Sequence, residues 1–351
     1  MDNNKLQGIR EIARLANVSI GTVDRVIHNR KGVSPNTHKK ITAIIEELGY
    51  QPNKMASLLA SKKKLTIAIL IPKVSTETDY WLFPLNGIQQ AAEEIKQFGV
   101  KIQYHFFDLD SKKSFTTAAG KMLKSKPSAI LLAPSFVEES VSLMEKINQQ
   151  EIPVIFINSD LPQMPGLTYI GPDLYQSGRL GAQLVSKCLK TDFPILVVNL
   201  YTNLEIDHHL IKKVQGFTNF LEEQGQNTTV KILNIDKTDH RKIEQELLKE
   251  LKGKINYQGL FVTNSRVNIV ADILKKHQLK PLLIGYDFLE KNIAHLVSGQ
   301  IDFLIGQRPK EQGYMGIMML YKYLYNISEP TGSTYMPIDI ITKENYKYYY
   351  S

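Results

Sequence analysis

Polar and aromatic side chains follow the apolar segments in the second part of this 351-residue sequence. Aspartate, asparagine and glutamine form hydrogen bonds of fixed geometry, which suits sugar hydroxyls, and aromatic rings stack on the apolar faces of a sugar ring. The pattern therefore predicts a site for a small polar ligand. Its candidate residues are Tyr80, Trp81, Phe83, Asn158, Asp160, Asp173, Asn264, Asp287 and Gln307.

Each acidic or amide residue could instead cap the helix that follows it, because such side chains accept hydrogen bonds from the first N–H groups of a helix. Capping remains the alternative for any one of them. The whole set favours a ligand site, since these residues follow several separate apolar segments. The residues with both readings are Asp160, Asp173, Asn264, Asp287 and Gln307.

Motifs for catalysis or metal binding are absent from the sequence. There is no G-x-x-x-x-G-K-[ST], no G-x-S-x-G and no H-E-x-x-H. The adjacent His208 and His209 cannot share a helix face, so we interpret them as surface residues. Cys188, the only cysteine, lies in an apolar helical segment and is expected in the core. We predict no catalytic residue, metal or cofactor, and an enzyme on the same framework is the alternative.

From Leu65 onward, short apolar runs alternate with amphipathic helical stretches. Continuous apolar runs are typical of buried parallel strands, and the alternation predicts an α/β fold built from βαβ units. The runs form two series, which predicts two doubly wound parallel-sheet lobes with a ligand cleft at the strand carboxyl ends. The runs are TIAILIP, VKIQYHFFD, AILLAP and PVIFIN, then PILVVNL, VKILNI, GLFVTN, PLLIGYD and DFLIGQ.

We assign residues 65–351 to this two-lobed core. The N lobe is expected at about 65–165 and 302–328, and the C lobe at about 166–301 and 329–351. The aromatic tail from Tyr346 to Tyr350 is expected to pack on the C lobe.

Residues 8–49 show the spacing of three short helices. Gly8–Ala16 and Ile20–His28 carry apolar residues at helical spacing, with Ser19 as an N-cap between them. A third helix is predicted from Pro35 to just before Gly49. Two short helices joined by a tight turn fit a helix-turn-helix, although any small three-helix bundle shows the same pattern.

Positive charge is concentrated in the same segment. Residues 1–64 hold 12 Lys and Arg residues against 5 Asp and Glu residues, a net charge of +7, whereas the remaining 287 residues carry a net charge of +1. This asymmetry favours a polyanionic partner such as DNA, with a solvated basic face as the alternative. The polar candidates for DNA contact are Ser19, Thr22, Arg25, His28 and Asn29.

The sequence motifs of residues 9–59 make the interpretation more specific. I-x-x-I-A-x-x-A-x-V-S-x-x-T-V-x-R-V is followed by V-S-x-x-T, then I-x-x-L-G-Y-x-P-N and A-x-x-L. This string resembles the DNA-binding head of the lactose-repressor (LacI/GalR) family of bacterial transcription regulators. The remainder resembles the periplasmic-binding-protein-like type I core that this family carries, so the resemblance spans nearly the whole chain.

The resemblance implies a role for each matching residue of the head. Residues 1–51 would form the head and residues 52–64 a hinge helix and linker. Arg25 would contact a guanine, and Leu59 would wedge into the minor groove. The other implied contacts are Ser19 and Thr22 to phosphates, Ile20 and Gly21 to bases, Tyr50 and Asn53 to the DNA backbone, and Ala56 between paired hinge helices.

The sequence departs from the family at several positions. Asp24 stands where serine is usual; it could accept from a cytosine, but we expect it to pair with His28. Asn158 stands where the family often has an acid, and His208 and His209 stand where it often has an arginine. These changes leave the ligand class open.

We therefore predict a DNA-binding transcriptional regulator, a repressor, whose operator affinity is controlled by a sugar bound between the lobes. A nucleobase, a polyol or a phosphosugar remains an alternative effector. A homodimer on a pseudo-palindromic operator is expected. The sequence lacks a signal-peptide apolar segment and a membrane span, so a cytoplasmic location is expected and a secreted binding protein is not.

Overall fold

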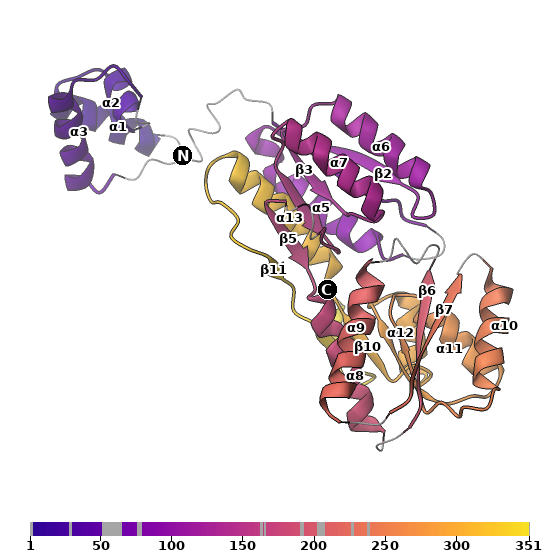
Figure 1. The fold of residues 1–351 in the computed structure, drawn as a ribbon. Coiled ribbons are helices and arrows are strands. Elements are labelled where there is room, and N and C mark those ends of the chain that lie inside the picture. The colour runs from indigo at the N-terminus through magenta and orange to yellow at the C-terminus, as the bar shows by residue number, and fades with distance from the viewer. Residues whose placement is uncertain are drawn as a thin grey trace. The chain divides into compact units, whose positions relative to one another are not determined.

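The computed structural model describes residues 3–27, 30–50, 65–75, 79–161, 164, 166–189, 193–201, 208–225, 228–236 and 239–350. The chain forms two compact units, Met1–Lys63 and Lys64–Ser351 (Figure 1). The hinge and linker predicted at 52–64 lie outside the described residues, as do five predicted DNA contacts: His28, Asn29, Asn53, Ala56 and Leu59.

The described residues of the N-terminal unit form three helices, as predicted: α1 (Asn3–Ala16), α2 (Ile20–Ile27) and α3 (Pro35–Glu47). Asn17 adopts a left-handed φ of 56° in the turn between α1 and α2. The hydroxyl of Ser34 accepts from the backbone N–H of Thr37 and so caps α3. The three helices enclose one small core of Ile12, Ala13, Ala16, Val23, Val26 and Ile41.

The N lobe of the second unit is built on a parallel sheet of order β11-β5-β4-β3-β1-β2. Its strands are β1 (Leu65–Pro72), β2 (Val100–Phe107), β3 (Ala129–Leu132), β4 (Val154–Ile157), β5 (Thr168–Gly171) and β11 (Thr334–Tyr335). Because successive strand residues face opposite sides, Ile130 and Leu132 pack under α6 (Lys112–Lys124) and α7 (Val137–Gln149), while Leu131 meets α13 (Pro309–Leu324). Helix α5 (Leu82–Ile95) pairs with α13 and continues into the short η1 (Lys96–Phe98).

The C lobe repeats this arrangement with a sheet of order β12-β10-β9-β8-β6-β7. Its strands are β6 (Ile195–Tyr201), β7 (Val230–Asp236), β8 (Gly259–Val262), β9 (Leu282–Tyr286), β10 (Phe303–Gly306) and the antiparallel β12 (Asp339–Ile341). Helices α8 (Leu174–Cys188) and α9 (His208–Glu223) cover one face. Helices α10 (His240–Leu251), α11 (Val267–Lys276) and α12 (Glu290–Val297) cover the other.

The aromatic tail packs on the C lobe, as predicted. It ends in η2 (Tyr346–Tyr349), whose Tyr346 and Tyr349 lie against the core under α10, α11 and α12. The ring of Phe288 lies 6.0 Å from that of Tyr349 and 5.0 Å from that of Tyr350.

The lobe boundaries predicted from the sequence were wrong at three strands. Strands β5 and β11 belong to the N-lobe sheet, although residues 166–301 and 329–351 were assigned to the C lobe. Strand β10 belongs to the C-lobe sheet, although 302–328 was assigned to the N lobe. The chain crosses between lobes after β5, after β10 and after β11, in segments of two or three residues. Such short crossings leave no compositional signal.

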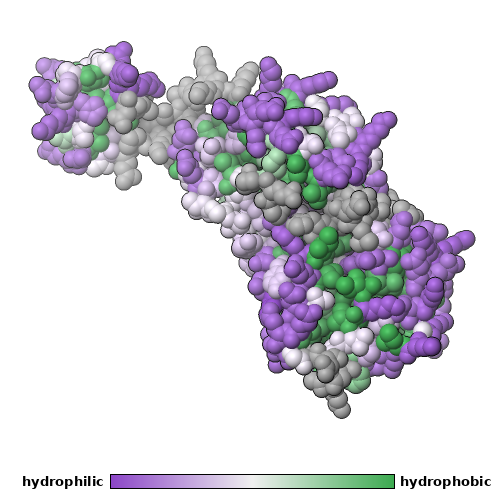
Figure 2. All heavy atoms as spheres, viewed as in Figure 1, coloured by the Kyte–Doolittle hydropathy of each residue, from purple (hydrophilic) through white to green (hydrophobic). Residues whose placement is uncertain are grey.

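Edge strands and one surface of the C lobe expose apolar groups. On β2 the ring centres of Tyr104 and Phe106 are 5.9 Å apart, and both rings are exposed. The prediction that this run is a buried strand was therefore wrong, because β2 lies at the edge of its sheet. Figure 2 shows a hydrophobic area that interrupts the hydrophilic surface of the C lobe. Ile211 and Ile232 are among the large apolar side chains exposed on this lobe. No helix in the described ranges is long and apolar enough to cross a membrane.

Glycines let one helix pair in each lobe approach closely. A Cβ atom on Gly178 of α8 would overlap the carbonyl oxygen of Lys213 on α9, and one on Gly87 of α5 would overlap that of Lys310 on α13. The backbone of α9 is therefore fixed against α8 at Lys213.

We predict that Gly178→Val lowers the free energy of unfolding by about 1–3 kcal/mol, because the added side chain forces α8 and α9 apart. Gly120→Ala is the matched control: Gly120 is exposed in α6 with nothing within 4 Å of an added Cβ. The control should be neutral or stabilising by about 0.5–1 kcal/mol. Urea denaturation of the two variants measures both values, and equal effects would contradict the close packing.

Candidate functional site

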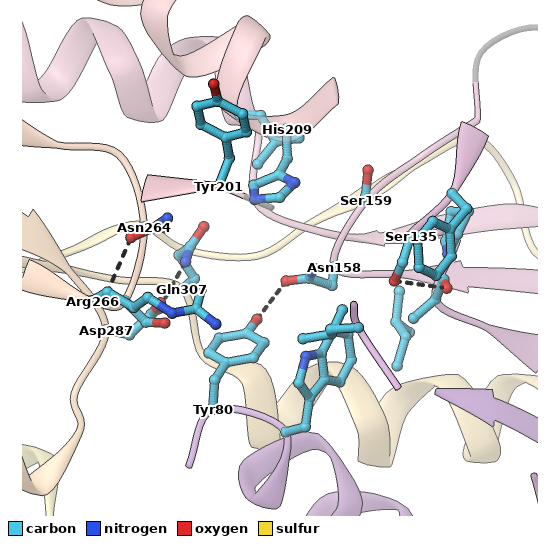
Figure 3. Close-up of a pocket in the computed structure, with 18 of the residues that line it drawn as sticks. Tyr80, Ser135, Asn158, Ser159, Tyr201, His209, Asn264, Arg266, Asp287 and Gln307 are labelled. Atoms are coloured by element: carbon cyan, nitrogen blue, oxygen red, sulfur yellow. Dashed lines mark hydrogen bonds between the residues drawn. The ribbon is translucent and has the colours of Figure 1, made fainter. Parts of the chain in front are cut away.

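A cavity of about 310 Å³ lies between the two lobes, at the carboxyl ends of their strands. Both lobes contribute lining residues (Figure 3). Six of the residues predicted for a ligand site line it: Tyr80, Trp81, Asn158, Asn264, Asp287 and Gln307.

The N-lobe wall contains a pair of aromatic rings beside an amide side chain. The hydroxyl of Tyr80 donates to Oδ1 of Asn158 at 2.5 Å, and the ring of Trp81 meets that of Tyr80 edge-on at 5.3 Å. Asn158 has a left-handed φ of 69°, a conformation that asparagine tolerates better than most residues. Burial raises the pKa of Tyr80 well above its usual value, so its hydroxyl is a donor at neutral pH.

The C-lobe wall holds a buried carboxylate. Asp287 is 3% exposed, and Gln307 Nε2 donates to its Oδ1 at 2.7 Å. Burial raises the pKa of Asp287 to about 6, while the charge of Lys213 and the Gln307 hydrogen bond act in the opposite direction. The backbone of Asp287 has a left-handed φ of 72°, and the buried amide of Asn292 donates to its carbonyl oxygen at 3.1 Å.

A buried lysine accompanies this carboxylate. The Lys213 ammonium is 3.5 Å from the ring centre of Tyr286 and donates to the carbonyl oxygen of Thr263 at 3.1 Å. Burial lowers the pKa of Lys213 to about 8, opposed by the charge of Asp287. At neutral pH the wall therefore presents one carboxylate and one ammonium, each held by neutral groups.

Asn264 is held by two hydrogen bonds to the backbone, neither of which caps α11. Its Nδ2 donates to the carbonyl oxygen of Leu200 at 2.6 Å, and its Oδ1 accepts from the backbone N–H of Arg266 at 3.2 Å. It also lines the cavity, together with Arg266, which is 9% exposed. In Figure 3 these residues lie on the same side as Asp287 and Gln307, opposite Asn158.

Three predicted ligand residues do not line the cavity. Asp173 caps α8, with Oδ1 accepting from Gln176 N at 3.0 Å, so the capping alternative holds there. Asp160 binds Lys212 Nζ with both carboxylate oxygens at 3.0 Å, which links the N lobe to α9 of the C lobe. Phe83 lies in the first turn of α5, outside the cavity lining.

Several lining residues were missed. They include Asp110, Lys112, Ser135, Phe136, Ser159, Tyr201, His209, Lys213, Ser265 and Arg266. Most lie at the end of β6 or follow β2, β3, β4 or β8, so the strand-end rule applied to every strand would have included them. Lys213 follows His209 by four residues on α9, and this spacing puts both on one helix face.

Two interpretations of single residues were wrong. His209 is half-buried and lines the cavity rather than the outer surface, because the start of α9 points at the cleft. Cys188 is exposed rather than in the core, because it is the last residue of α8, where the helix leaves the sheet. Within the described ranges, no group of three or more His, Cys, Asp or Glu side chains is placed to hold a metal ion.

In the head, the predicted base-reading residues share the exposed face of α2. Ile20 is 46% exposed and Arg25 is exposed, whereas Val23 and Val26 point into the core. Ser19 Oγ accepts from Thr22 N at 3.1 Å and lies 2.9 Å from Thr22 Oγ1, so it caps α2 as predicted. The start of α2 is thus exposed at Ser19, Ile20 and Gly21, with Thr22 half-buried.

Two further head residues make contacts that the sequence did not predict. Asp24 Oδ2 accepts from Arg30 Nη1 at 3.1 Å. The pairing of Asp24 with His28 stays a prediction, because His28 lies outside the described residues. Tyr50 was predicted to contact the DNA backbone. Its ring packs on the head core and its hydroxyl is buried, because Gly49 turns the chain back after α3 with a φ of 56°.

The buried carboxylate predicts a pH dependence of stability. The pKa of Asp287 is about 6 in the folded chain, whereas its ordinary value, which applies in the unfolded chain, is 3.8. The folded chain therefore binds this proton more tightly. Its contribution to stability is therefore present below pH 3.8 and lost as the pH rises through 6. The free energy of unfolding of the wild type should fall relative to Asp287→Asn across this range.

Urea denaturation of the wild type and Asp287→Asn at a series of pH values measures this difference. Asp173→Asn, which keeps a cap on α8, shows what the same substitution does outside the cavity. Parallel curves for the wild type and Asp287→Asn would contradict the raised pKa.

Comparison with known proteins agrees with both units. Residues 67–327 match the family model of the periplasmic binding protein domain, and residues 8–53 match that of bacterial regulatory proteins of the lacI family. The HTH-type transcriptional regulator DegA of Bacillus subtilis (strain 168) is 27% identical over 62% of this chain and 61% of its own length. Catabolite control protein A of Priestia megaterium is 29% identical over the same shares. The match thus spans about three fifths of these curated relatives, which are regulators and not enzymes.

Solved structures resemble the two-lobed core. A candidate LacI transcriptional regulator from Bacteroides fragilis has a TM-score of 0.77 and 26% identity, covering 82% of this chain and all of that one. GanP, a glucose-galactose binding protein from Geobacillus stearothermophilus, has a TM-score of 0.69 and 21% identity over 81% of this chain and 99% of its own, which shows the fold alone. The chain therefore belongs to the periplasmic binding protein domain family through residues 67–327 and carries a helix-turn-helix head of the lacI family at residues 8–53.

Proposed function

We propose that this protein is a transcriptional repressor whose affinity for its DNA operator is controlled by a small polyhydroxylated effector bound between the lobes. The observation that carries the proposal is the exposed start of α2, held on the head core, in the same chain as a polar interlobe cavity. A regulator that binds chromosomal DNA would act in the cytoplasm, which is the location that we propose.

The head would read DNA with α2 in the major groove. The guanidinium of Arg25 can form two parallel hydrogen bonds to a guanine, and exposed Ile20 can contact a thymine methyl group. Ser19 and Thr22 would contact phosphates, and the net charge of +7 in residues 1–64 would supply the nonspecific attraction. By resemblance, Asn53 would contact the DNA backbone, Ala56 would let the paired hinge helices approach, and Leu59 would wedge into the minor groove.

The cavity suits a sugar. Asp287, Asn264 and Gln307 offer acceptors and donors, Lys213 and Arg266 offer charged donors, and Trp81 offers an aromatic surface. Structurally similar proteins are described in complex with D-arabinose, myo-inositol, D-allose and α-D-tagatopyranose. A sugar or polyol of this size is the effector class that we propose, with a nucleobase or phosphosugar as the alternative.

Effector binding would change the separation of the lobes and, through it, the hinge segments of a homodimer on a pseudo-palindromic operator. The effector and the operator must then alter each other's affinity by the same factor. Exposed apolar groups support self-association: Tyr104 and Phe106 on the edge strand β2, and Ile211 and Ile232 on the C lobe.

For the head, we predict that Arg25→Ala weakens operator binding by about 5- to 150-fold, the value of one bidentate base contact. The operator is first recovered by binding the protein to genomic fragments at controlled salt and sequencing those retained. Arg14→Ala is the matched control, because it removes the same charge from the head while Arg14 is occupied by Glu11 at 2.6 Å. Equal losses for both variants would mean that Arg25 contributes charge only.

For the cavity, we predict that Asp287→Asn weakens effector binding by about 10- to 150-fold, because it replaces a charged hydrogen-bond acceptor by a neutral amide. The sugars named above are titrated into the protein–operator complex, followed by fluorescence anisotropy of labelled operator. Asp173→Asn, outside the cavity, should keep the wild-type response. A normal response in Asp287→Asn would remove Asp287 from the effector site.

A further inference from the structure

One fully buried side chain, Gln312, joins the two lobes. It lies in the first turns of α13 and has no exposed surface. Its Oε1 accepts from the backbone N–H of Asn158 at 3.0 Å, and its Nε2 donates to the backbone carbonyl of Gln307 at 2.8 Å. Asn158 follows β4 of the N-lobe sheet and Gln307 follows β10 of the C-lobe sheet, so a single amide connects the carboxyl ends of both sheets.

Both bridged residues place their own side chains in the cavity. Asn158 accepts from Tyr80 at 2.5 Å, and Gln307 donates to Asp287 at 2.7 Å. Hydrogen bonds therefore run from Tyr80 on one wall, through Gln312, to Asp287 on the other. Gln312 itself does not line the cavity.

The backbone beside this bridge is constrained. Asn158, whose N–H is bridged, and Arg308, which follows the bridged Gln307, both have left-handed φ values, 69° and 50°. For residues other than glycine such conformations persist only where the surroundings hold them. The Arg308 guanidinium is in turn held by Asp339 of β12, at 2.7 and 3.0 Å.

Glutamine fits this position because its amide has one acceptor and one donor end. An ionised glutamate would turn an acceptor oxygen toward the Gln307 carbonyl. An apolar side chain would take away the donor to that carbonyl and would leave the Asn158 N–H only its longer bond to the Ile170 carbonyl, at 3.3 Å. Either change should weaken the link between the lobes.

We propose that Gln312 is a positioning residue of the effector site, which sets the separation of the two cavity walls by tying β4 to β10. The name effector site rests on the proposed function; the bridge itself is a property of the chain without ligand or DNA. By fixing Asn158 and Gln307 relative to each other, Gln312 allows one ligand to contact both walls at once.

The chain offers a matched control in Asn292, a second fully buried amide. Its Nδ2 donates to the carbonyls of Ser265, Tyr286 and Asp287 at 3.0–3.1 Å, all within the C lobe. Asn292→Asp is thus the same chemical change as Gln312→Glu, but in a bridge that stays inside one lobe.

The experiment measures the distance between the lobes in the full-length protein, without sugar or operator. Spin labels are attached to the native Cys188, exposed at the end of α8 in the C lobe, and to Lys124→Cys, exposed at the end of α6 in the N lobe. Double electron–electron resonance gives the distance distribution, with labelled chains diluted into unlabelled protein so that distances within one chain dominate.

Gln312→Glu and Gln312→Met should both broaden this distribution and shift it to longer distances, whereas Asn292→Asp should leave it as in the wild type. Unchanged distributions in folded Gln312 variants would overturn the proposal, and so would equal broadening by Asn292→Asp. Circular dichroism confirms folding. Should the variants not fold, amide hydrogen exchange of the wild type decides: the Asn158 N–H should be protected as strongly as the amides of β4, and rapid exchange would overturn the bridge.

Because neither measurement uses DNA or sugar, its result is independent of whether the protein is a regulator. A normal bridge in a chain that binds no operator would contradict the proposed function alone. A missing bridge in a sugar-responsive regulator would contradict the role of Gln312 alone.

Discussion

The cavity depends on one constraint: the chain crosses between the lobes three times, after β5, β10 and β11. Each crossing is tied to its neighbours. Tyr169 donates to the Pro172 carbonyl at 2.9 Å, Gln312 donates to that of Gln307 at 2.8 Å, and the Met336 N–H donates to the Gly171 carbonyl at 2.8 Å. Three chain crossings leave the lobes few ways to move other than opening and closing. A ligand that contacted both walls would therefore shift the balance between the open and the closed arrangement.

The alternation of apolar runs and helices was sufficient to predict two parallel-sheet lobes, because a buried parallel strand requires an apolar run and a crossover helix. It was insufficient to assign β5 and β10 to a lobe. Strand β5 pairs with β4, and β10 pairs with β9. Each pairing depends on which sheet has an unpaired edge strand beside the new strand, and only the assembled lobes determine that. A strand followed by a two-residue crossing carries the same local pattern in either sheet.

The same limit applies to the cavity. Asp173 and Asp287 both follow a strand of a parallel sheet, yet Asp173 caps α8 from an extended conformation, while Asp287 has a φ of 72° and lines the cavity. The difference arises from Asn292 and Gln307, which hold the backbone and the carboxylate of Asp287 from elsewhere in the fold. Strand-end position therefore predicts candidates, and the tertiary hydrogen bonds select among them.

Lys213 and Asp287 bear on how this cavity would bind the neutral polar ligand that we propose. Removing these charges from water costs free energy when the chain folds, as the raised pKa of Asp287 and the lowered pKa of Lys213 indicate. Gln307, Thr263 and the Tyr286 ring satisfy them only in part. A ligand hydroxyl then finds a donor and an acceptor that are already desolvated and oriented, so little reorganisation opposes its hydrogen bonds. Folding thus desolvates and orients the charged groups of the C-lobe wall. The separation of the lobes then determines whether the N-lobe wall would contact the same ligand.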